Sequence, residues 1–317
     1  MNELEKVIKE KRTYKNKPKK LVKYGTIAVD VVETTPVVWQ DRLLRFVWNR
    51  DINKRKDGID ISSSGCYQLI DMQTDEIVAE FGKNHSFGSA FSENGKMYAI
   101  GTYGGFGSDT LVEFVSEDLV NWESHTIFSN PEWTIYNTSF CKGKDGYILA
   151  IEIDRPAEIA GVPYTIVFLR SDDLMNWEFL DTKKHVYRTD RYSACPAIRY
   201  VDGYYYMIYL ESFPAYNYSP YIVRSKDLSQ WEVAPMNPIM FYSDEDRNVL
   251  HPEKFTPEQL EEIATSLNTN NSDVDLCEWN GKTVILYSWG NQLGSEFLAY
   301  AEYDGPIKEF LESFFNT

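Results

Sequence analysis

The chain has 317 residues, of which 43% are hydrophobic and 15% aromatic, so it can bury a sizeable core. Its formal charge of −16 argues against nucleic acid or an anionic membrane surface as the main partner. The sequence holds no run of 18 apolar residues, so we expect no transmembrane helix. Abundant Tyr and Phe, with Val, Ile and Thr in short runs, favour a β-rich fold.

Residues 1–24 are interpreted as a charged N-terminal extension. The opening MNELEKVIKEKRTYKNKPKK carries charges throughout and lacks the apolar core of a signal peptide. We therefore expect a soluble, cytoplasmic protein, although a chain trimmed of its leader would look the same. Cys141, Cys195 and Cys277 lie in apolar stretches without metal-type spacing, which favours reduced, buried thiols.

A turn motif repeats through the middle of the chain. SEDLVNW (116–122), SDDLMNW (171–177) and SKDLSQW (225–231) share the form Ser-x-Asp-Leu-x-x-Trp, and their starts lie 55 and 54 residues apart. Each copy lies between two strand-like runs, where the Asp side chain can accept hydrogen bonds from turn amides. Repeats of this period are typical of propellers and solenoids.

A hairpin signal marks each repeat as well. Asn-Gly, Asp-Gly or a related pair suits the positive φ that a tight hairpin needs. These turns are expected at Asp41, Asn94, Asp145, Asp202 and Asn280. Strands at this density, without helices between them, predict an all-β fold: a five-bladed β-propeller with antiparallel blades, forming one domain over 25–317.

The last unit is preceded by an inserted loop at about 240–270. Within it, TPEQLEEIATSLN predicts a short helix, with Thr256 as N-cap and Pro257 in the first turn. The last unit lacks a strand, and we expect the segment around Gly25–Val32 to supply it and close the ring. A second short helix is expected in PIKEFLESFF near the C-terminus.

The five units, the turn motif and runs such as CPAIRYVDGYYYMIYLES resemble the five-bladed β-propeller glycoside hydrolases. The resemblance is to family 43 and its relatives 32, 62, 117 and 130, over roughly residues 30–310. It implies a sugar site at one mouth of the central channel, built from the starts of the innermost strands. Hydrolysis would then follow an inverting mechanism, with one carboxylate activating water and one acid protonating the leaving oxygen.

The family's catalytic carboxylates are not matched at the expected positions. The family has an Asp-Pro in the first blade, an Asp in the second and a Glu-Gly-Pro in the fourth. Aligned on the hairpin turns, this chain has Thr35, Ser89 and Ala194 at those places. Either the alignment slips, the chemistry has moved to other residues, or the chain is not a hydrolase.

Acidic residues at the channel mouth are the catalytic candidates. Asp273 and Asp275 open the last inner strand two residues apart, so their alpha carbons lie roughly 7 Å apart on one face. Carboxylates that close need a proton, a cation or a substrate between them; turn capping, or an axial cation such as calcium, is the alternative role. The full set of catalytic candidates is Asp275, Asp273, Glu211, Glu33, Glu152 and His85.

The other four candidates have separate reasons. Glu152 and Glu211 each end an apolar run, so burial should raise their pKa values and suit a general acid; a salt bridge is the alternative for Glu211. Glu33 lies two residues before Thr35 and can replace the missing base. His85 is proposed by analogy with family 117, whereas a lone histidine is more often structural.

Polar and aromatic residues at the same strand ends are candidates for substrate binding. Two arginines could clamp an anionic group on a sugar, and a tryptophan could stack on its face. The expected substrate-binding residues are Arg155, Arg191, Asn137, Asp190, Trp289, Asn291 and Gln292. We expect no metal and no cofactor, because the four histidines show no metal-ligand spacing.

The function expected from the sequence is that of a glycoside hydrolase that cleaves a small oligosaccharide or glycoside in the central pocket. The partner is then a small saccharide, and the sequence does not indicate the oligomeric state. The first alternative is a non-catalytic sugar-binding propeller that has lost the catalytic triad. A propeller interaction scaffold is a third interpretation, and it predicts a flat apolar rim instead of a polar mouth.

Overall fold

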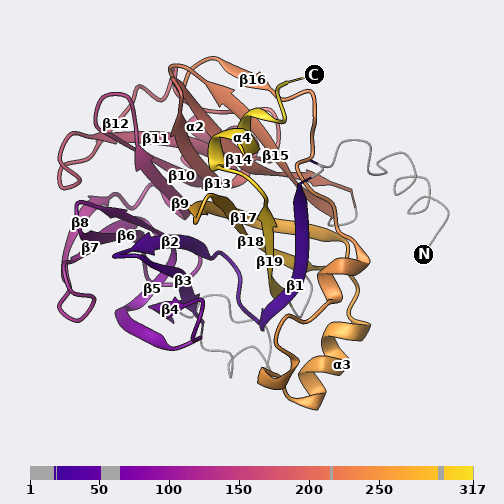
Figure 1. Cartoon of the computed structure of the whole chain (residues 1–317). Coiled ribbons are helices and arrows are strands. Elements are labelled where there is room, and N and C mark those ends of the chain that lie inside the picture. Colours follow the sequence, from indigo (N-terminus) through magenta and orange to yellow (C-terminus); the bar gives the residue numbers. More distant parts are fainter. Residues whose placement is uncertain (1–17, 19, 51–64, 215–216, 292–295, 317) are drawn as a thin grey trace.

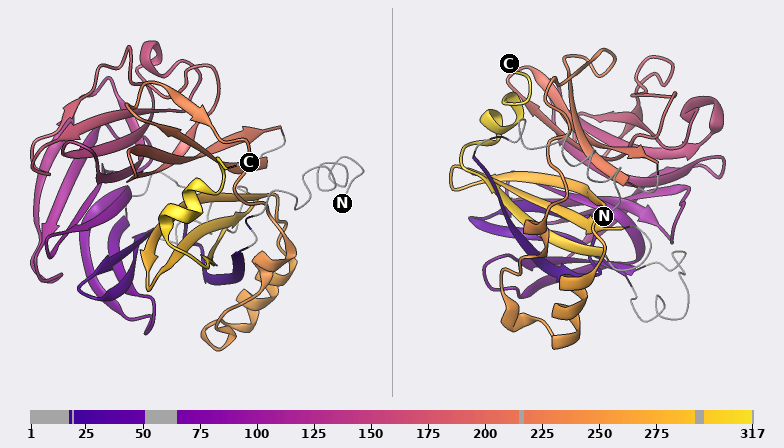
Figure 2. Two further views of the ribbon diagram at one scale, coloured as in Figure 1. Left: turned by 45° about the horizontal axis from the view of Figure 1, so that its top comes forward. Right: turned by 90° about the vertical axis from the view of Figure 1, so that its right-hand side faces the viewer.

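The computed structural model describes residues 18, 20–50, 65–214, 217–291 and 296–316. These residues form an all-β structure of antiparallel sheets with a few short helices, as the sequence predicts. Figure 1 shows the sheets following one another along the chain, and the two further views of Figure 2 show them grouped about the middle of the molecule. No helix among the described residues is long and apolar enough to cross a membrane.

The largest sheet has seven strands and contains one long strand that serves two groups. The first part of β5 pairs with β4 and its second part pairs with β6. Gly82 and Asn84 lie between these parts with φ values of 60° and 65°, which bends the strand. The sheet runs in the order β2 (Thr35–Trp39), β3 (Arg42–Asn49), β4 (Gly65–Asp71), β5 (Ile77–Glu93), β6 (Lys96–Tyr103), β7 (Thr110–Ser116) and β8 (Glu123–Ser129).

Two four-stranded sheets follow in the middle of the chain. Each is an antiparallel meander in which consecutive strands are neighbours. The first contains β9 (Thr134–Lys142), β10 (Tyr147–Arg155), β11 (Thr165–Ser171) and β12 (Glu178–Phe179). The second contains β13 (Ala194–Val201), β14 (Tyr204–Phe213), β15 (Asn217–Ser225) and β16 (Trp231–Val233).

The last sheet joins the two ends of the chain. It consists of β17 (Asn270–Trp279), β18 (Lys282–Gly290), β19 (Glu296–Tyr303) and β1 (Leu21–Val29). Strand β1 pairs antiparallel with β19, and Figure 1 shows these indigo and yellow strands side by side. The prediction that the N-terminal segment supplies the missing strand is confirmed. The strand begins at Leu21, four residues before the expected start of the domain.

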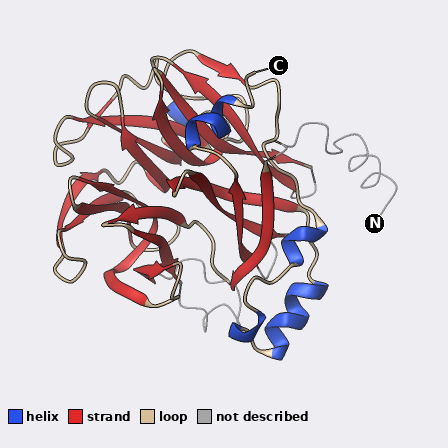
Figure 3. Ribbon diagram, in the orientation of Figure 1, coloured by secondary structure: helices blue, strands red, loops and turns tan. Residues whose placement is uncertain are grey.

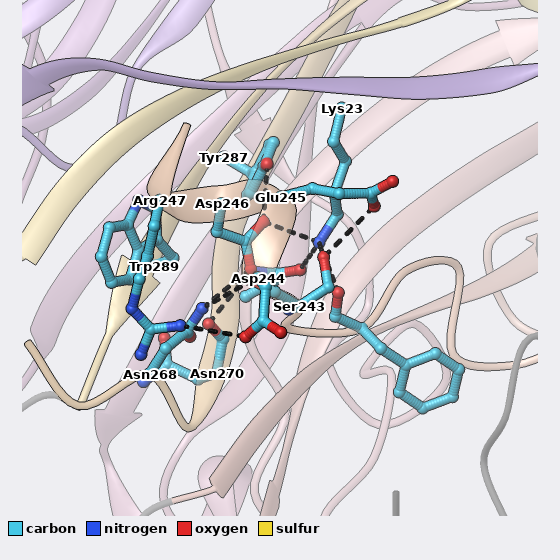
Figure 4. Close-up of polar contacts among 12 residues, drawn as sticks. Lys23, Ser243, Asp244, Glu245, Asp246, Arg247, Asn268, Asn270, Tyr287 and Trp289 are labelled. Atoms are coloured by element: carbon cyan, nitrogen blue, oxygen red, sulfur yellow. Dashed lines mark hydrogen bonds and ion pairs between the residues drawn. The ribbon is translucent and has the colours of Figure 1, made fainter. Parts of the chain in front are cut away.

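A buried ion pair fastens β1 to the inserted loop (Figure 4). The Lys23 ammonium lies 2.7 Å from the Asp246 carboxylate, and their side chains are 3% and 0% exposed. Lys23 also donates to the Asn271 side chain, and Asp246 accepts a 2.8 Å hydrogen bond from the Tyr287 hydroxyl. The backbone amide of Ser243 and the side-chain amide of Asn268 donate to the other carboxylate oxygen. This network connects β1, the insertion, β17 and β18.

The turn motif has the structural role expected of it. In the first copy, the Asp118 carboxylate accepts hydrogen bonds from the amides of Val120 and Asn121. Asp173 and Asp227 make the same pair of bonds in the other copies. The motif's leucines are buried and adopt positive φ near 61–63°, a conformation that the fixed turn imposes.

The helices lie outside the strands (Figure 3). The predicted inserted helix is α3 (Pro257–Thr265), and Thr256 and Gln259 form a reciprocal capping box at its start. The predicted C-terminal helix is α4 (Ile307–Glu312). The remaining short helices are α2 (Ala157–Ala160), η2 (Asp244–Arg247) and η3 (Pro252–Lys254).

The core is divided into layers between neighbouring sheets. One apolar cluster joins the β9–β12 sheet to the β13–β16 sheet, and another joins the β13–β16 sheet to the sheet closed by β1. The inner strands contact one another in the cyclic order β2, β5, β9, β13 and β17, and β17 contacts β2. The starts of these strands therefore surround a common axis.

Candidate functional site

A pocket opens where the inner strands begin. It encloses about 300 Å³ of space, counted to its open mouth. Its walls come from the starts of β2, β9, β13 and β17 and from the second part of β5. The lining residues are Glu33, Thr34, Thr35, Gly88, Asn137, Thr138, Cys195, Pro196, Asp273, Val274 and Asp275.

Left-handed backbone conformations occur at four positions in or next to the pocket lining. Glu33, Phe87, Cys195 and Asp273 have φ values of 55°, 42°, 49° and 49°. In β5, β13 and β17 the same places carry a shift of the strand register. Such irregularities re-aim side chains and are common beside functional sites.

Glu33 is held in an environment that opposes its ionised form. Burial raises the pKa of its carboxyl well above the usual value, and the nearby carboxylates of Asp273 and Glu152 raise it further. The Arg50 guanidinium acts in the opposite direction. The buried Oε2 atom of Glu33 has no hydrogen-bond partner among the described residues. Burial and the neighbouring carboxylates therefore favour the neutral form of the Glu33 carboxyl.

Glu152 lies directly behind the pocket wall, near the end of β10. Its side chain accepts hydrogen bonds from the Asn137 side-chain amide at 3.0 Å and from the Cys195 backbone amide at 2.8 Å. Burial raises the pKa of Glu152 to about 7, the two hydrogen bonds lower it, and the charge of Asp273 raises it. Glu152 is thus able to gain and lose a proton near neutral pH.

The Asp273 carboxylate is close enough to both Glu33 and Glu152 to raise their pKa values. It lines the pocket, and its Oδ2 atom accepts a 2.7 Å hydrogen bond from the Ser272 hydroxyl. The Cys195 thiol is also hydrogen-bonded to Asp273, and its pKa is raised well above the usual value by burial first and by the Asp273 charge second. Glu33 and Asp273 therefore line one pocket, and Glu152 is buried behind its wall.

Asp275 lines the same pocket but is tied into an ion pair. Its Oδ1 atom lies 2.5 Å from the Arg199 guanidinium and accepts a 2.8 Å hydrogen bond from the Leu276 amide. The register shift between Ser272 and Asp275 interrupts the regular alternation from which the sequence placed both aspartates on one face. The structure gives Asp275 a bridging role between β13 and β17.

Besides Glu152, which lies behind the wall, two more expected catalytic residues lie outside the pocket lining. Glu211 is buried on β14, where it accepts a 2.8 Å hydrogen bond from Tyr209 and lies 3.6 Å from Arg191. His85 is buried against the rings of Tyr67 and Phe114, and burial lowers its pKa. These contacts match the structural alternatives that the sequence left open for both residues.

The expected substrate-binding residues are dispersed. Asn137 lines the pocket, whereas Arg155, Asp190 and Arg191 are exposed. Asp190 pairs with Arg188 at 2.9 Å. Asn291 is half-buried just after β18, and Gln292 lies outside the described residues.

The structure corrects the substrate-binding role predicted for Trp289. Its ring is 0% exposed, it stacks on Phe297, and its indole donates to the Thr26 hydroxyl at 2.9 Å. A fully enclosed ring has no face for a sugar, so Trp289 is a core residue that packs between β18 and β1. Sequence reasoning placed it at the mouth because its strand ends with polar residues.

Cys195 is a pocket residue that sequence reasoning did not choose. It occupies the middle position of Ala194-Cys195-Pro196, which resembles the Glu-Gly-Pro of family 43. The left-handed φ of 49° explains why the family has glycine there, and that positional match was the available signal. No group of three or more His, Cys, Asp or Glu side chains among the described residues is arranged to hold a metal ion.

Comparison with solved structures shows which known proteins share this fold. No protein-family model matches the sequence, and no curated protein matches it. Among solved structures, a BT0996 RGII complex superposes with a TM-score of 0.64 at 13% identity, and the match covers 96% of each protein. A thermostable family-43 glycoside hydrolase gives 0.60 at 11% identity, covering 87% of this chain and 90% of its own.

A third structure extends the likeness to another family. A Bombyx mori family-32 β-fructofuranosidase mutant, solved in complex with sucrose, superposes with a TM-score of 0.55 at 14% identity. The match covers 94% of this chain and 65% of that one. The chain therefore has the fold of the propeller glycoside hydrolases. The resemblance expected from the turn motifs is confirmed at the level of the fold.

Proposed function

We propose that the protein is a glycoside hydrolase that cleaves a small oligosaccharide or glycoside in the axial pocket. The observation that carries this proposal is that Glu33, just before β2, and Asp273, in β17, line one pocket, while Glu152, in β10, is hydrogen-bonded to residues of its wall. Because β5 serves two groups of strands, we count five blades, with the pocket at one mouth of the ring. The partner is a small saccharide.

The three carboxyl groups suit different roles. With a pKa of about 7, Glu152 is a general acid that protonates the leaving oxygen. Asp273 lies in the pocket lining and serves as the base that activates water. Glu33 binds a sugar hydroxyl, and the raised pKa of its carboxyl favours the neutral form, which can donate a hydrogen bond.

The residues that depart from the family pattern are consistent with a general acid that comes from a different strand. Ala194 stands where the family has its glutamate. Glu152 reaches the same strand start from the neighbouring sheet, where it accepts the hydrogen bond from the Cys195 amide. A small side chain at position 194 leaves room for the carboxyl that arrives from β10. Glu33 likewise lies two residues before Thr35, in the place of the missing first-blade acid.

Turnover of a panel of aryl glycosides and oligosaccharides tests the proposal. Glu152→Gln and Asp273→Asn should each lower kcat by about a hundredfold or more. Glu211→Gln is the matched control, because the buried Glu211 carboxyl contacts Tyr209 and Arg191 instead of residues that line the pocket, and it should keep most of the activity. Proton NMR of the first product would report the stereochemistry.

The alternative function has a distinct result. If no substrate in the panel is turned over while calorimetry detects saccharide binding, the protein is a sugar-binding propeller without hydrolase activity. Full activity in Glu152→Gln would contradict the role given to Glu152. Loss of activity in Glu211→Gln alone would place the chemistry at a different site.

A further inference from the structure

Three tyrosines form a continuous aromatic surface beside the pocket. Tyr164 and Tyr192 meet edge to face, with ring centroids 5.6 Å apart, and Tyr192 and Tyr218 have the same centroid separation. Tyr164 follows α2, Tyr192 precedes β13, and Tyr218 lies in β15. Each of the three residues is half-buried. We call Tyr164, Tyr192 and Tyr218 the tyrosine ledge.

The ledge adjoins the pocket on the side of Glu152. Tyr192 lies three residues before Cys195, and the intervening Ser193 donates its amide to the Tyr164 carbonyl at 2.8 Å. The pKa of the Tyr192 hydroxyl is raised well above its usual value by burial, and the neighbouring Cys195 and Glu152 raise it further. The ledge is therefore continuous with the wall in front of the proposed acid.

A polar group lies beneath the ledge. Tyr136 contacts the Tyr164 ring at 4.9 Å between centroids, and its hydroxyl donates to the Asp154 Oδ2 atom at 3.1 Å. The Oδ1 atom of Asp154 is buried and has no hydrogen-bond partner among the described residues. A buried carboxylate oxygen without a partner can accept a hydrogen bond from the hydroxyl of a ligand that displaces a neighbouring side chain.

The size of the pocket limits what it can hold. The space of about 300 Å³ includes solvent at the open mouth, so the enclosed part is smaller than that. A substrate of two rings must therefore extend out of the pocket onto its rim, where the second ring lies next to the linking oxygen.

The geometry points to the tyrosine ledge as the binding site for the leaving group of the substrate, either a second sugar ring or an aryl group. Such a group has a flat apolar face that packs on Tyr192 and Tyr218, since tyrosine offers an apolar face with a polar edge. The ledge lies on the side of Glu152, so the linking oxygen is placed within reach of the acid. This inference rests on the proposed function.

Binding measurements on the Glu152→Gln variant test the ledge without catalysis. The probes are paired methyl and p-nitrophenyl glycosides of the same sugars, titrated by calorimetry. Tyr192→Ala and Tyr218→Ala should each weaken binding of the p-nitrophenyl glycoside about five- to tenfold and leave the methyl glycoside within twofold. Tyr192→Phe should retain tight binding, which also shows that loss in the alanine variant is not a folding defect.

Tyr200→Ala is the matched control, because Tyr200 is a half-buried tyrosine in ring contact with Tyr205 at the opposite end of β13. It should leave both probes unaffected. Equal losses for the two probes in the ledge variants, or no loss for either, would overturn the ledge while leaving the proposed function intact. If the Glu152→Gln protein binds neither the methyl nor the p-nitrophenyl glycoside of any sugar tested, both the proposed function and the ledge are rejected.

Discussion

The backbone amide of Cys195 donates a 2.8 Å hydrogen bond to the Oε2 atom of Glu152, and so joins the start of β13 to the end of β10. The amide is available because Cys195 lies in the irregular stretch between the Ala194 and Ala197 pairs of the β13–β14 ladder. Cys195, in a left-handed conformation at the start of β13, thus holds the side chain of Glu152, the proposed acid, in the neighbouring sheet. The position of Glu152 depends on backbone geometry that any residue able to adopt this φ would supply.

The pH profile of hydrolysis should follow the proton on Glu152. Its pKa of about 7 lies above the usual glutamate value, so the protonated form persists to neutral pH and is lost as the pH rises through 7. We therefore expect kcat/KM to fall about tenfold per pH unit above that point. Initial rates between pH 5 and 9 check this, and a profile without a fall up to pH 9 would contradict the assignment.

Removal of the Asn137 amide should shift that profile. Asn137 donates to the Glu152 carboxylate and so lowers its pKa. A hydrogen bond to a charged group contributes about 1.5 kcal/mol or more, so Asn137→Ala should move the fall in rate upward by about one pH unit. An NMR titration of labelled glutamate gives the same pKa without turnover. Thr138→Ala is the control, because Thr138 lines the pocket and donates to Ile100 instead.

The sequence predicted the features that local chemistry controls. Asp118 and its two counterparts cap their turns as expected, and Thr256 caps the inserted helix. The pairing of β1 with β19 followed from counting strands in the last unit. Each of these depends on hydrogen bonds or strand counts within a short segment, which one sequence can reveal.

Side-chain direction at the pocket could not be predicted in the same way. Positive φ at Glu33 and Asp273 breaks the two-residue alternation on which strand reasoning relies. Trp289 was placed at the mouth by its position in the strand, but it packs against Thr26 from the far end of the chain. The ledge tyrosine Tyr192 comes from a loop, and its neighbours depend on how three sheets meet.

The buried Lys23–Asp246 pair should dominate the stability of the ring closure. Lys23→Met leaves the Asp246 carboxylate buried without its cation, which typically costs about 3–5 kcal/mol. Urea denaturation should show a lower midpoint with an unchanged slope. Lys20→Met is the control: Lys20 pairs with Glu309 in an exposed bridge on the same segment, so its loss should change the midpoint little. Equal midpoints for Lys23→Met and wild type would show that β1 contributes little to closure.

Glu113 should make the stability of the protein depend on pH. Its carboxyl is fully buried 3.1 Å from the His125 ring, and burial raises its pKa to about 8. The folded state therefore keeps a proton that the unfolded state releases near pH 4.5, so stability should fall as the pH rises from 4.5 to 8 and level off above 8. Glu113→Gln removes this dependence, because the amide cannot ionise.

The difference between the two proteins isolates this one carboxyl, because the pocket glutamates contribute equally to both. We expect Glu113→Gln to gain on the order of 2–4 kcal/mol relative to wild type between pH 5 and pH 8. Urea unfolding at half-unit pH steps measures the gain. The exposed Glu117→Gln variant, which loses only a surface pair with Lys96, should run parallel to wild type. A Glu113→Gln curve that also runs parallel to wild type would contradict the raised pKa of Glu113.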